Sequence, residues 1–239
     1  DLVAILYTSG TTGIPKGVML SNSNLVNDCF LAQMNMQIYH TDVFYALLPV
    51  HHAYTMLSVL VVGIAQSAEV VFAKRLVVKE MLKDLKDGQI TIFLGVPMLF
   101  NKLIANIMKG VREKGIVLYS IVRFLMFISG ILKKCGIKIG KKLFGKMILD
   151  KANLSSIRIC ISGGGPLPSS TFRMFNQLGL DFVQGYGLTE TSPIVTLNPI
   201  YHFKVKSVGL VLPEINVKII NPDKDGRGEI ALKGPTVMQ

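Results

Sequence analysis

The chain has 239 residues, of which 50% are hydrophobic, and its formal net charge is +11. This length can bury one sizeable core, and the high apolar content excludes a disordered protein. Three scattered cysteines, without a C-x-x-C pair or a metal-ligand spacing to the four histidines, predict reduced thiols in a cytoplasmic protein. The chain opens on a strand-like run and not on a basic and apolar leader, so we expect no signal peptide.

Strand-like and helix-like segments alternate along most of the chain. Strands are predicted at residues 2–7, 42–48, 69–72, 91–95, 157–162 and 181–186. Helices are predicted at residues 22–37, 53–65, 77–86, 97–108, 116–134, 139–150 and 168–178. This alternation predicts an α/β fold, with a mostly parallel sheet flanked by helices. Short strands at residues 216–220 and 228–233 predict a small, mainly-β segment at the C-terminal end. We therefore expect a core at residues 1–192 and the start of a β-rich subdomain at residues 193–239.

The loop after the first strand is rich in hydroxyl side chains and glycine. The apolar run at residues 2–6 predicts a buried strand. It is followed by Thr8, Ser9, Gly10, Thr11, Thr12, Gly13 and Lys16. Backbone N–H groups and hydroxyls in such a loop can surround a polyphosphate, to which Lys16 adds a positive charge. The loop does not end in Gly-Lys-Ser/Thr, so it is not a Walker A loop. By itself, the pattern also fits a flexible surface turn.

Two further glycine-rich loops follow later strands. The first contains Gly163, Gly164 and Gly165, which form either a tight turn or a wall without side chains for a flat base or an acyl group. The second contains Gln184, Gly185, Tyr186, Gly187, Thr189 and Glu190.

Within the second loop, the Tyr186 ring suits stacking on adenine, and the Thr189 hydroxyl suits an α-phosphate. Glu190 offers the hard oxygen that Mg²⁺ prefers, although an acid at a helix N-terminus is the ordinary alternative.

Two adjacent histidines, His51 and His52, end another predicted strand. Such a pair can line a carboxylate pocket and donate to the reacting oxygen, and we favour His52 for this contact. Ligands gather at the carboxyl ends of parallel strands. We therefore expect the loops after Tyr7, Leu48, Ser162 and Tyr186 to converge on one crevice.

In order and character, these four motifs resemble the signature of the adenylate-forming superfamily, which includes acyl-CoA synthetases, luciferases and peptide-synthetase adenylation domains. Residues 93–100 and the basic insertion before Ser162 resemble bacterial long-chain fatty acyl-CoA synthetases. The resemblance implies that the chain is part of the large N-terminal domain of such an enzyme, without the C-terminal lid domain. We therefore expect the isolated fragment to be inactive.

The resemblance also implies a reaction and its site residues. A fatty carboxylate reacts with MgATP to give acyl-AMP, and coenzyme A then displaces AMP. Lys16, His52, Thr189 and Glu190 are the implied catalytic residues, with Glu190 holding Mg²⁺. Thr8 to Gly13 and Lys16 would hold the β- and γ-phosphates, and the two later loops would hold the base and α-phosphate. The alternatives are an aryl-CoA ligase, an amino-acid adenylating domain, or an inactive fragment that binds nucleotide or lipid.

The positive charge is concentrated in residues 102–151, which hold twelve Lys or Arg residues and two acidic residues, a net charge of +10. This segment is either a solvated helical hairpin or a contact surface for anionic lipid, which would place the protein peripherally on the inner face of the membrane. Its apolar run at residues 116–132 carries Arg123 in the middle, so we expect it to lie on the domain or in the membrane interface and not to cross. We expect no nucleic-acid partner, and a homodimer stays open.

Overall fold

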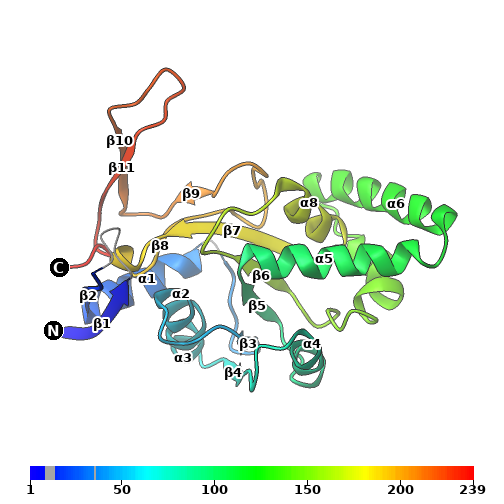
Figure 1. Ribbon diagram of the computed structural model, residues 1–239, viewed down its shortest axis with the longest axis horizontal. Helices are drawn as coiled ribbons and strands as arrows, with labels where there is room; N and C mark the ends of the chain where they lie inside the picture. The colour runs from blue at the N-terminus through cyan, green and yellow to red at the C-terminus, as the bar shows by residue number, and fades with distance from the viewer. Residues whose placement is uncertain (9–13, 35) are drawn as a thin grey trace.

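The computed structural model describes residues 1–8, 14–34 and 36–239. Its centre is a seven-stranded sheet in the order β4-β3-β5-β6-β7-β8-β9 (Figure 1). These strands are β3 (Val43–Ala46), β4 (Glu69–Phe72), β5 (Ile92–Gly95), β6 (Ile159–Ser162), β7 (Asp181–Gly187), β8 (Ile194–Leu197) and β9 (Leu210–Val211). The strands from β4 to β7 run parallel, while β8 and β9 pair antiparallel at the β7 side. The predicted α/β class with a mostly parallel sheet is confirmed.

Helices cover both faces of this sheet. They are α1 (Asn22–Met34), α2 (Ala53–Thr55), α3 (Val62–Ala65), α4 (Val78–Asp87), α5 (Pro97–Arg112), α6 (Ile116–Lys134), α7 (Gly140–Phe144) and α8 (Ser169–Gln177). Side chains alternate across each strand, so on β5 Phe93 enters the core beneath α4, α5, α6 and α8, whereas Ile92 and Leu94 enter the core beneath α1 and α2. Two buried cores, one on each face, therefore fix the sheet between its helices.

Two predicted helices are interrupted by wider turns. Between α2 and α3 the chain forms a π-helical stretch, η1 (Met56–Val61), and after α7 it forms a second one, η2 (Gly145–Leu149). Helical π-turns are frequent near functional sites, and η1 follows the short helix α2, which begins directly after His52. The helical character of both segments was predicted, but their changes of pitch were not.

The first strand differs from its prediction. β1 (Leu2–Thr8) pairs antiparallel with β2 (Lys16–Ser21) in a separate two-stranded sheet, and β2 was not predicted. β1 was expected to be buried, but Leu2, Val3 and Ile5 are about half exposed. The expectation was wrong because β1 packs through one face only, while the other face has no cover among the described residues.

The C-terminal end forms another hairpin, β10 (Asn216–Ile220) and β11 (Glu229–Lys233), which projects from the body of the molecule (Figure 1). The small mainly-β segment is thus present. β8 and β9 lie before it and extend the central sheet, and the division at residue 192 stays a prediction.

Candidate active site

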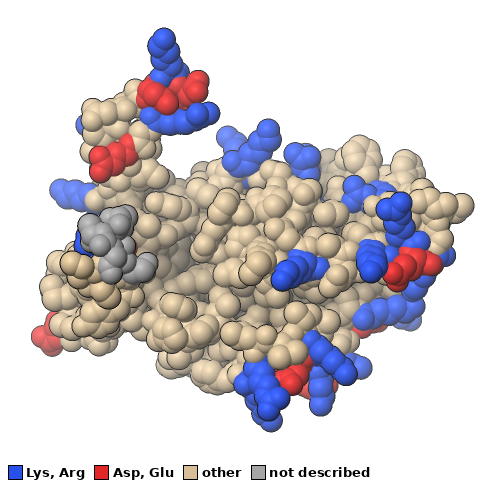
Figure 2. All heavy atoms as spheres, in the orientation of Figure 1, with Lys and Arg blue, Asp and Glu red and all other residues tan. Residues whose placement is uncertain are grey.

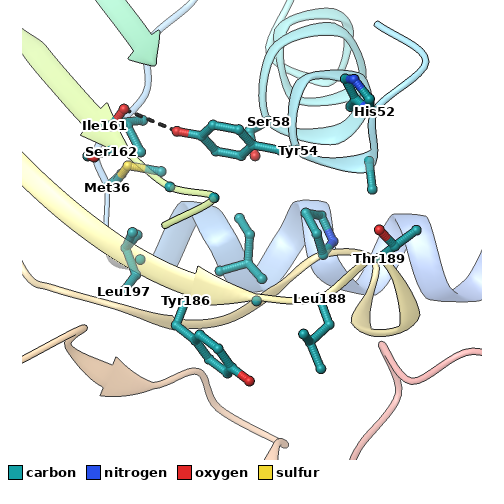
Figure 3. Close-up of a pocket in the computed structure, with 17 residues that line it drawn as sticks. Met36, His52, Tyr54, Ser58, Ile161, Ser162, Tyr186, Leu188, Thr189 and Leu197 are labelled. Carbon is teal, nitrogen blue, oxygen red and sulfur yellow. Dashed lines mark hydrogen bonds between the residues drawn. The ribbon is translucent and has the colours of Figure 1, made fainter. Parts of the chain in front are cut away.

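Loops that follow β3, β6 and β7 meet in one pocket at the carboxyl edge of the sheet. The pocket has a volume of about 210 Å³ and brings together His52, Gly163 and Gly164 with the loop that follows β7. Figure 3 shows His52 and Thr189 on one side of this pocket and Ser162 on the other. Three of the four loops expected to converge therefore do so.

Tyr54 forms the wall of the pocket between α2 and β6. Its hydroxyl donates a hydrogen bond to the Ile161 carbonyl oxygen over 3.1 Å, and burial raises the pKa of the phenol (Figure 3). A Cβ atom at Gly163 would lie 3.0 Å from the Tyr54 ring. Glycine at this position therefore lets the Tyr54 ring approach the end of β6.

A second hollow lies beyond the glycine-rich loop. It is lined by Gly164, Gly165, Gln184, Tyr186 and Lys206, among others, and it shares Gly164 and residues 185–187 with the first pocket. The Tyr186 ring lies on the opposite side of β7 from Tyr54 (Figure 3). The Tyr186 segment thus lies between two neighbouring cavities and lines both of them.

The loop after β7 is held tightly by backbone contacts. A Cβ atom at Gly187 would lie 1.7 Å from the Pro193 carbonyl oxygen. That oxygen accepts hydrogen bonds from the Leu188 N–H and the Thr191 hydroxyl, each 2.9 Å long. Gly187 is therefore required because the chain returns so closely to it at Pro193.

Two pocket residues were not identified from the sequence. The hydroxyl oxygens of Ser58 and Ser162 are buried, and neither has a hydrogen-bond partner among the described residues. Both residues line the first pocket. The spacing of Tyr54 and Ser58, one helical turn apart, was the available signal, because it places both on one helix face.

Not every predicted site residue lines these cavities. His52, Gly163, Gly164, Gln184, Gly185, Tyr186, Gly187 and Thr189 line the first pocket or the second hollow, and so does Gly165. Neither cavity is lined by His51, Thr8, Lys16 or Glu190. Ser9, Gly10, Thr11, Thr12 and Gly13 lie outside the described residues.

The β1–β2 hairpin nevertheless lies beside the site. β2 contacts the 3-10 turn η3 (Thr189–Thr191), although the first loop follows an antiparallel strand and not a strand of the main sheet. The backbone oxygen of Glu190 accepts a hydrogen bond from Met238 N–H at 2.8 Å, which ties η3 to the C-terminal segment. Lys16 and Glu190 thus belong to elements in contact, next to the pocket that holds Thr189.

Metal ligands are sparse in the described part of the chain. It contains no group of three His, Cys, Asp or Glu residues that could hold an ion. Glu190 is therefore a single carboxylate. In nucleotide-binding sites, Mg²⁺ is commonly held by one or two carboxylates together with phosphate oxygens of the substrate and water. A single carboxylate at Glu190 fits this kind of site and does not fit a site made of protein ligands alone.

Comparison with known proteins identifies the family. The AMP-binding enzyme model matches residues 1–239. The chain is 29% identical to the long-chain-fatty-acid–CoA ligase ACSBG1 of Bos taurus, covering 98% of this chain and 34% of that protein. It is 31% identical to the 2-succinylbenzoate–CoA ligase of Bacillus licheniformis, covering 100% of this chain and 42% of that protein.

A solved structure agrees with these relatives. ATP-bound MatB from Rhodopseudomonas palustris superposes with a TM-score of 0.71 at 26% identity, over 100% of this chain and 41% of that one. The chain thus spans well under half the length of the proteins it matches. Because the family model covers the chain from end to end, this protein belongs to the AMP-binding, or adenylate-forming, enzyme family.

Proposed function

We propose that the chain is the nucleotide- and acyl-binding part of an AMP-forming fatty acid–CoA ligase. The observation that carries this proposal is the pair of adjoining cavities that share the glycine loops after β6 and β7. One reaction that joins a nucleotide to a carboxylate needs two such neighbouring sites. The 29% identity to a long-chain-fatty-acid–CoA ligase over 98% of the chain supports the choice of a fatty acid.

The donor set fits ATP with a magnesium ion. The second hollow is lined by Tyr186 and by the backbone of Gly164 and Gly165, and it suits a flat base. Thr189 lies in the first pocket and can donate its hydroxyl to a phosphate oxygen. Lys16 and Glu190, on contacting elements, supply a positive charge for phosphates and a carboxylate for the ion. When bound, magnesium would neutralise charge on the phosphates.

The chain contributes positioning and charge to the reaction, more than an acid or a base. His52 would donate to the carboxylate or α-phosphate oxygen, from the pocket wall beside Thr189. The carboxylate attacks the α-phosphorus, forming acyl-AMP and releasing pyrophosphate, and the thiolate of coenzyme A then displaces AMP. Both steps belong to the whole enzyme, so we expect little turnover from the isolated chain.

A second candidate function stays within the same enzyme family but has a different carboxylic acid as its substrate. The 31% identity to a 2-succinylbenzoate–CoA ligase favours an aryl or polar carboxylate. The buried hydroxyls of Ser58 and Ser162, which have no hydrogen-bond partner within residues 1–8, 14–34 and 36–239, also favour an acyl group with hydrogen-bonding atoms, because a purely aliphatic chain would not supply one. The experiment therefore has to determine which carboxylic acid the enzyme prefers.

Pyrophosphate exchange with ATP tests the proposal on the full-length parent enzyme. Fatty, aryl and amino acids are compared, and the fatty acids should give the fastest exchange. Lys16→Ala and Glu190→Ala should each lower exchange roughly a hundredfold, because a preorganised contact to developing charge is lost. Lys224→Ala and Glu113→Ala, at exposed positions away from the cavities, are the matched controls. Full exchange by Lys16→Ala and Glu190→Ala would refute the assigned roles, and fastest exchange with an aryl acid would favour the second candidate.

A further inference from the structure

Helix α6 is apolar on both of its faces. Its inner face buries Val122 and Met126 in the core beneath the sheet. Its outer face exposes Val117 by 71%, Phe124 by 63% and Phe127 by 59%. A helix that is apolar all round is normally buried on every side, inside a protein or in a membrane. The outer face of α6 therefore lacks a partner among the described residues.

The outer face forms one continuous stripe along the helix. Phe124, Phe127 and Ile131 follow one another at helical spacing, and Val117 and Ile121 extend the stripe towards the N-terminus. The helix has 19 residues, which corresponds to a length of about 28 Å. It is long and apolar enough to cross a membrane, so its attachment to the domain decides whether it spans or lies flat.

A buried lysine ties α6 to the domain. The Lys133 ammonium lies 2.8 Å from Asp181 Oδ1, and it donates hydrogen bonds to Asn176 Oδ1 and the Leu180 carbonyl oxygen. Crossing a bilayer would require breaking this buried ion pair and exposing the inner face. The helix therefore stays on the domain, and only its outer face is free to meet a partner.

Charge distinguishes this surface from other exposed apolar surfaces. Helix α1 also exposes Val26, Phe30 and Met34, but it contains no Lys or Arg. The segment around α6 holds twelve Lys or Arg residues and two acids. Figure 2 shows Lys and Arg side chains at the end of the molecule where α5 and α6 lie, and a further group of them around α4. A partner for α6 therefore has to be both apolar and negatively charged.

The cations lie at both ends of the stripe. Arg112 and Lys114 precede α6, Arg123 lies along its length and Lys134 closes it, and all four are exposed. Contact with Lys151 lowers the pKa of Lys114, because two cations lie close together there. Cations at both helix ends fit a helix lying parallel to an anionic surface, where every charge reaches the same layer of headgroups.

A groove beside the stripe combines the same two properties. Phe127 and Ile131 line it together with Lys134, and Arg173 of α8 adds a second exposed cation. Apolar side chains and cations thus meet along one edge of α6. This pairing matches the boundary between the acyl chains and the phosphates of a lipid layer.

We propose that the outer face of α6 docks on an anionic lipid bilayer, with the helix parallel to the membrane surface. Phe124, Phe127 and Ile131 enter the acyl boundary, and the flanking Lys and Arg residues contact lipid phosphates. The domain stays outside the bilayer.

Tryptophan fluorescence tests where the chain touches lipid, because the sequence contains no Trp. Phe124→Trp places a single reporter on the stripe, and Ile219→Trp places a matched reporter on the β10–β11 hairpin. With mixed phosphatidylcholine and phosphatidylglycerol vesicles, emission of Phe124→Trp should shift to the blue, and that of Ile219→Trp should not. Pure phosphatidylcholine or high salt should weaken the shift. No shift at Phe124→Trp, or equal shifts at both positions, would overturn the proposal.

Vesicle co-sedimentation supplies a second measurement on the same chain. Phe124→Gln, Phe127→Gln and Ile131→Gln combined should weaken binding at least roughly tenfold, since three apolar side chains leave the lipid. Ile219→Gln combined with Ile230→Gln is the matched control, and circular dichroism checks that each variant is folded. Unchanged binding by the triple variant contradicts the proposal. A dimer that the triple variant dissociates, without any lipid binding, would assign the face to a second copy instead.

Discussion

Substituting Gly187 with alanine perturbs the loop that joins both cavities. The added Cβ would lie 1.7 Å from the Pro193 carbonyl oxygen, whereas side-chain Cβ atoms essentially never approach within 3.0 Å. The two must separate by about 1.3 Å. That oxygen accepts hydrogen bonds from Leu188 and Thr191. Losing both should lower the free energy of unfolding by roughly 2 kcal/mol.

The same displacement should affect the reaction. Tyr186 directly precedes Gly187 and Thr189 follows it by two residues, so a shift of this size moves the proposed base and phosphate contacts. A misplacement of about 1 Å can lower a reaction rate roughly a hundredfold. Urea unfolding of the chain, followed by circular dichroism, measures the stability change. Pyrophosphate exchange by the full-length parent measures the change in rate.

Gly110→Ala is the matched control for this substitution. Gly110 lies in α5, and a Cβ atom there would meet nothing within 4 Å. Alanine should therefore raise the free energy of unfolding by up to about 1 kcal/mol, since it reduces the freedom of the unfolded chain. If Gly187→Ala unfolds at the same urea concentration as Gly110→Ala and exchanges at the parent rate, the contact with Pro193 does not constrain the site.

Two buried carboxyl groups should show opposite pH dependence. Burial alone would raise the pKa of Asp181, but Lys133 and Lys138 outweigh it and hold the pKa below its ordinary value. Asp181→Asn should therefore cost roughly 3 kcal/mol at neutral pH, because Lys133 loses its charge partner. This difference should begin to shrink as the pH falls below about 4, where the unfolded carboxyl becomes protonated, and it should disappear once the pH is below the lowered pKa of the folded carboxyl. Burial raises the pKa of Asp28 well above its ordinary value, despite its hydrogen bond from the Ile194 N–H. The folded state thus favours the protonated form, so Asp28→Asn should be more stable than the parent at pH 8, and the gain should shrink towards pH 4.

Urea unfolding across this pH range measures both effects. Adding Lys133→Met to Asp181→Asn should recover much of the lost stability, because no charge is then left buried without its partner. A loss that stays constant from pH 7 to pH 3 for Asp181→Asn would contradict the assigned ion pair. A destabilised Asp28→Asn at pH 8 would show that the ionised carboxylate is the favoured form in the fold.

The strand and helix pattern was predictable because burial repeats at short, regular intervals. On β5, the buried run from Ile92 to Leu94 fills cores on both faces, and such a run indicates an internal parallel strand. Pro97 at the first turn of α5 likewise indicated where that helix begins. The glycine loops and His52 were predicted to meet because the carboxyl ends of parallel strands share one edge.

The sequence by itself determined the α/β fold class, the family signature and the three loops that meet at the pocket, since these depend on local spacing and residue type. Only the tertiary structure decided which apolar residues are covered. β1 and the outer face of α6 are as apolar as internal segments, yet both are exposed. Likewise, only the folded chain brings Pro193 against Gly187 and leaves the Ser58 and Ser162 hydroxyls without hydrogen-bond partners in the part of the chain that the structure describes. Burial and hydrogen bonding depend on residues distant in the chain, which periodicity cannot reveal.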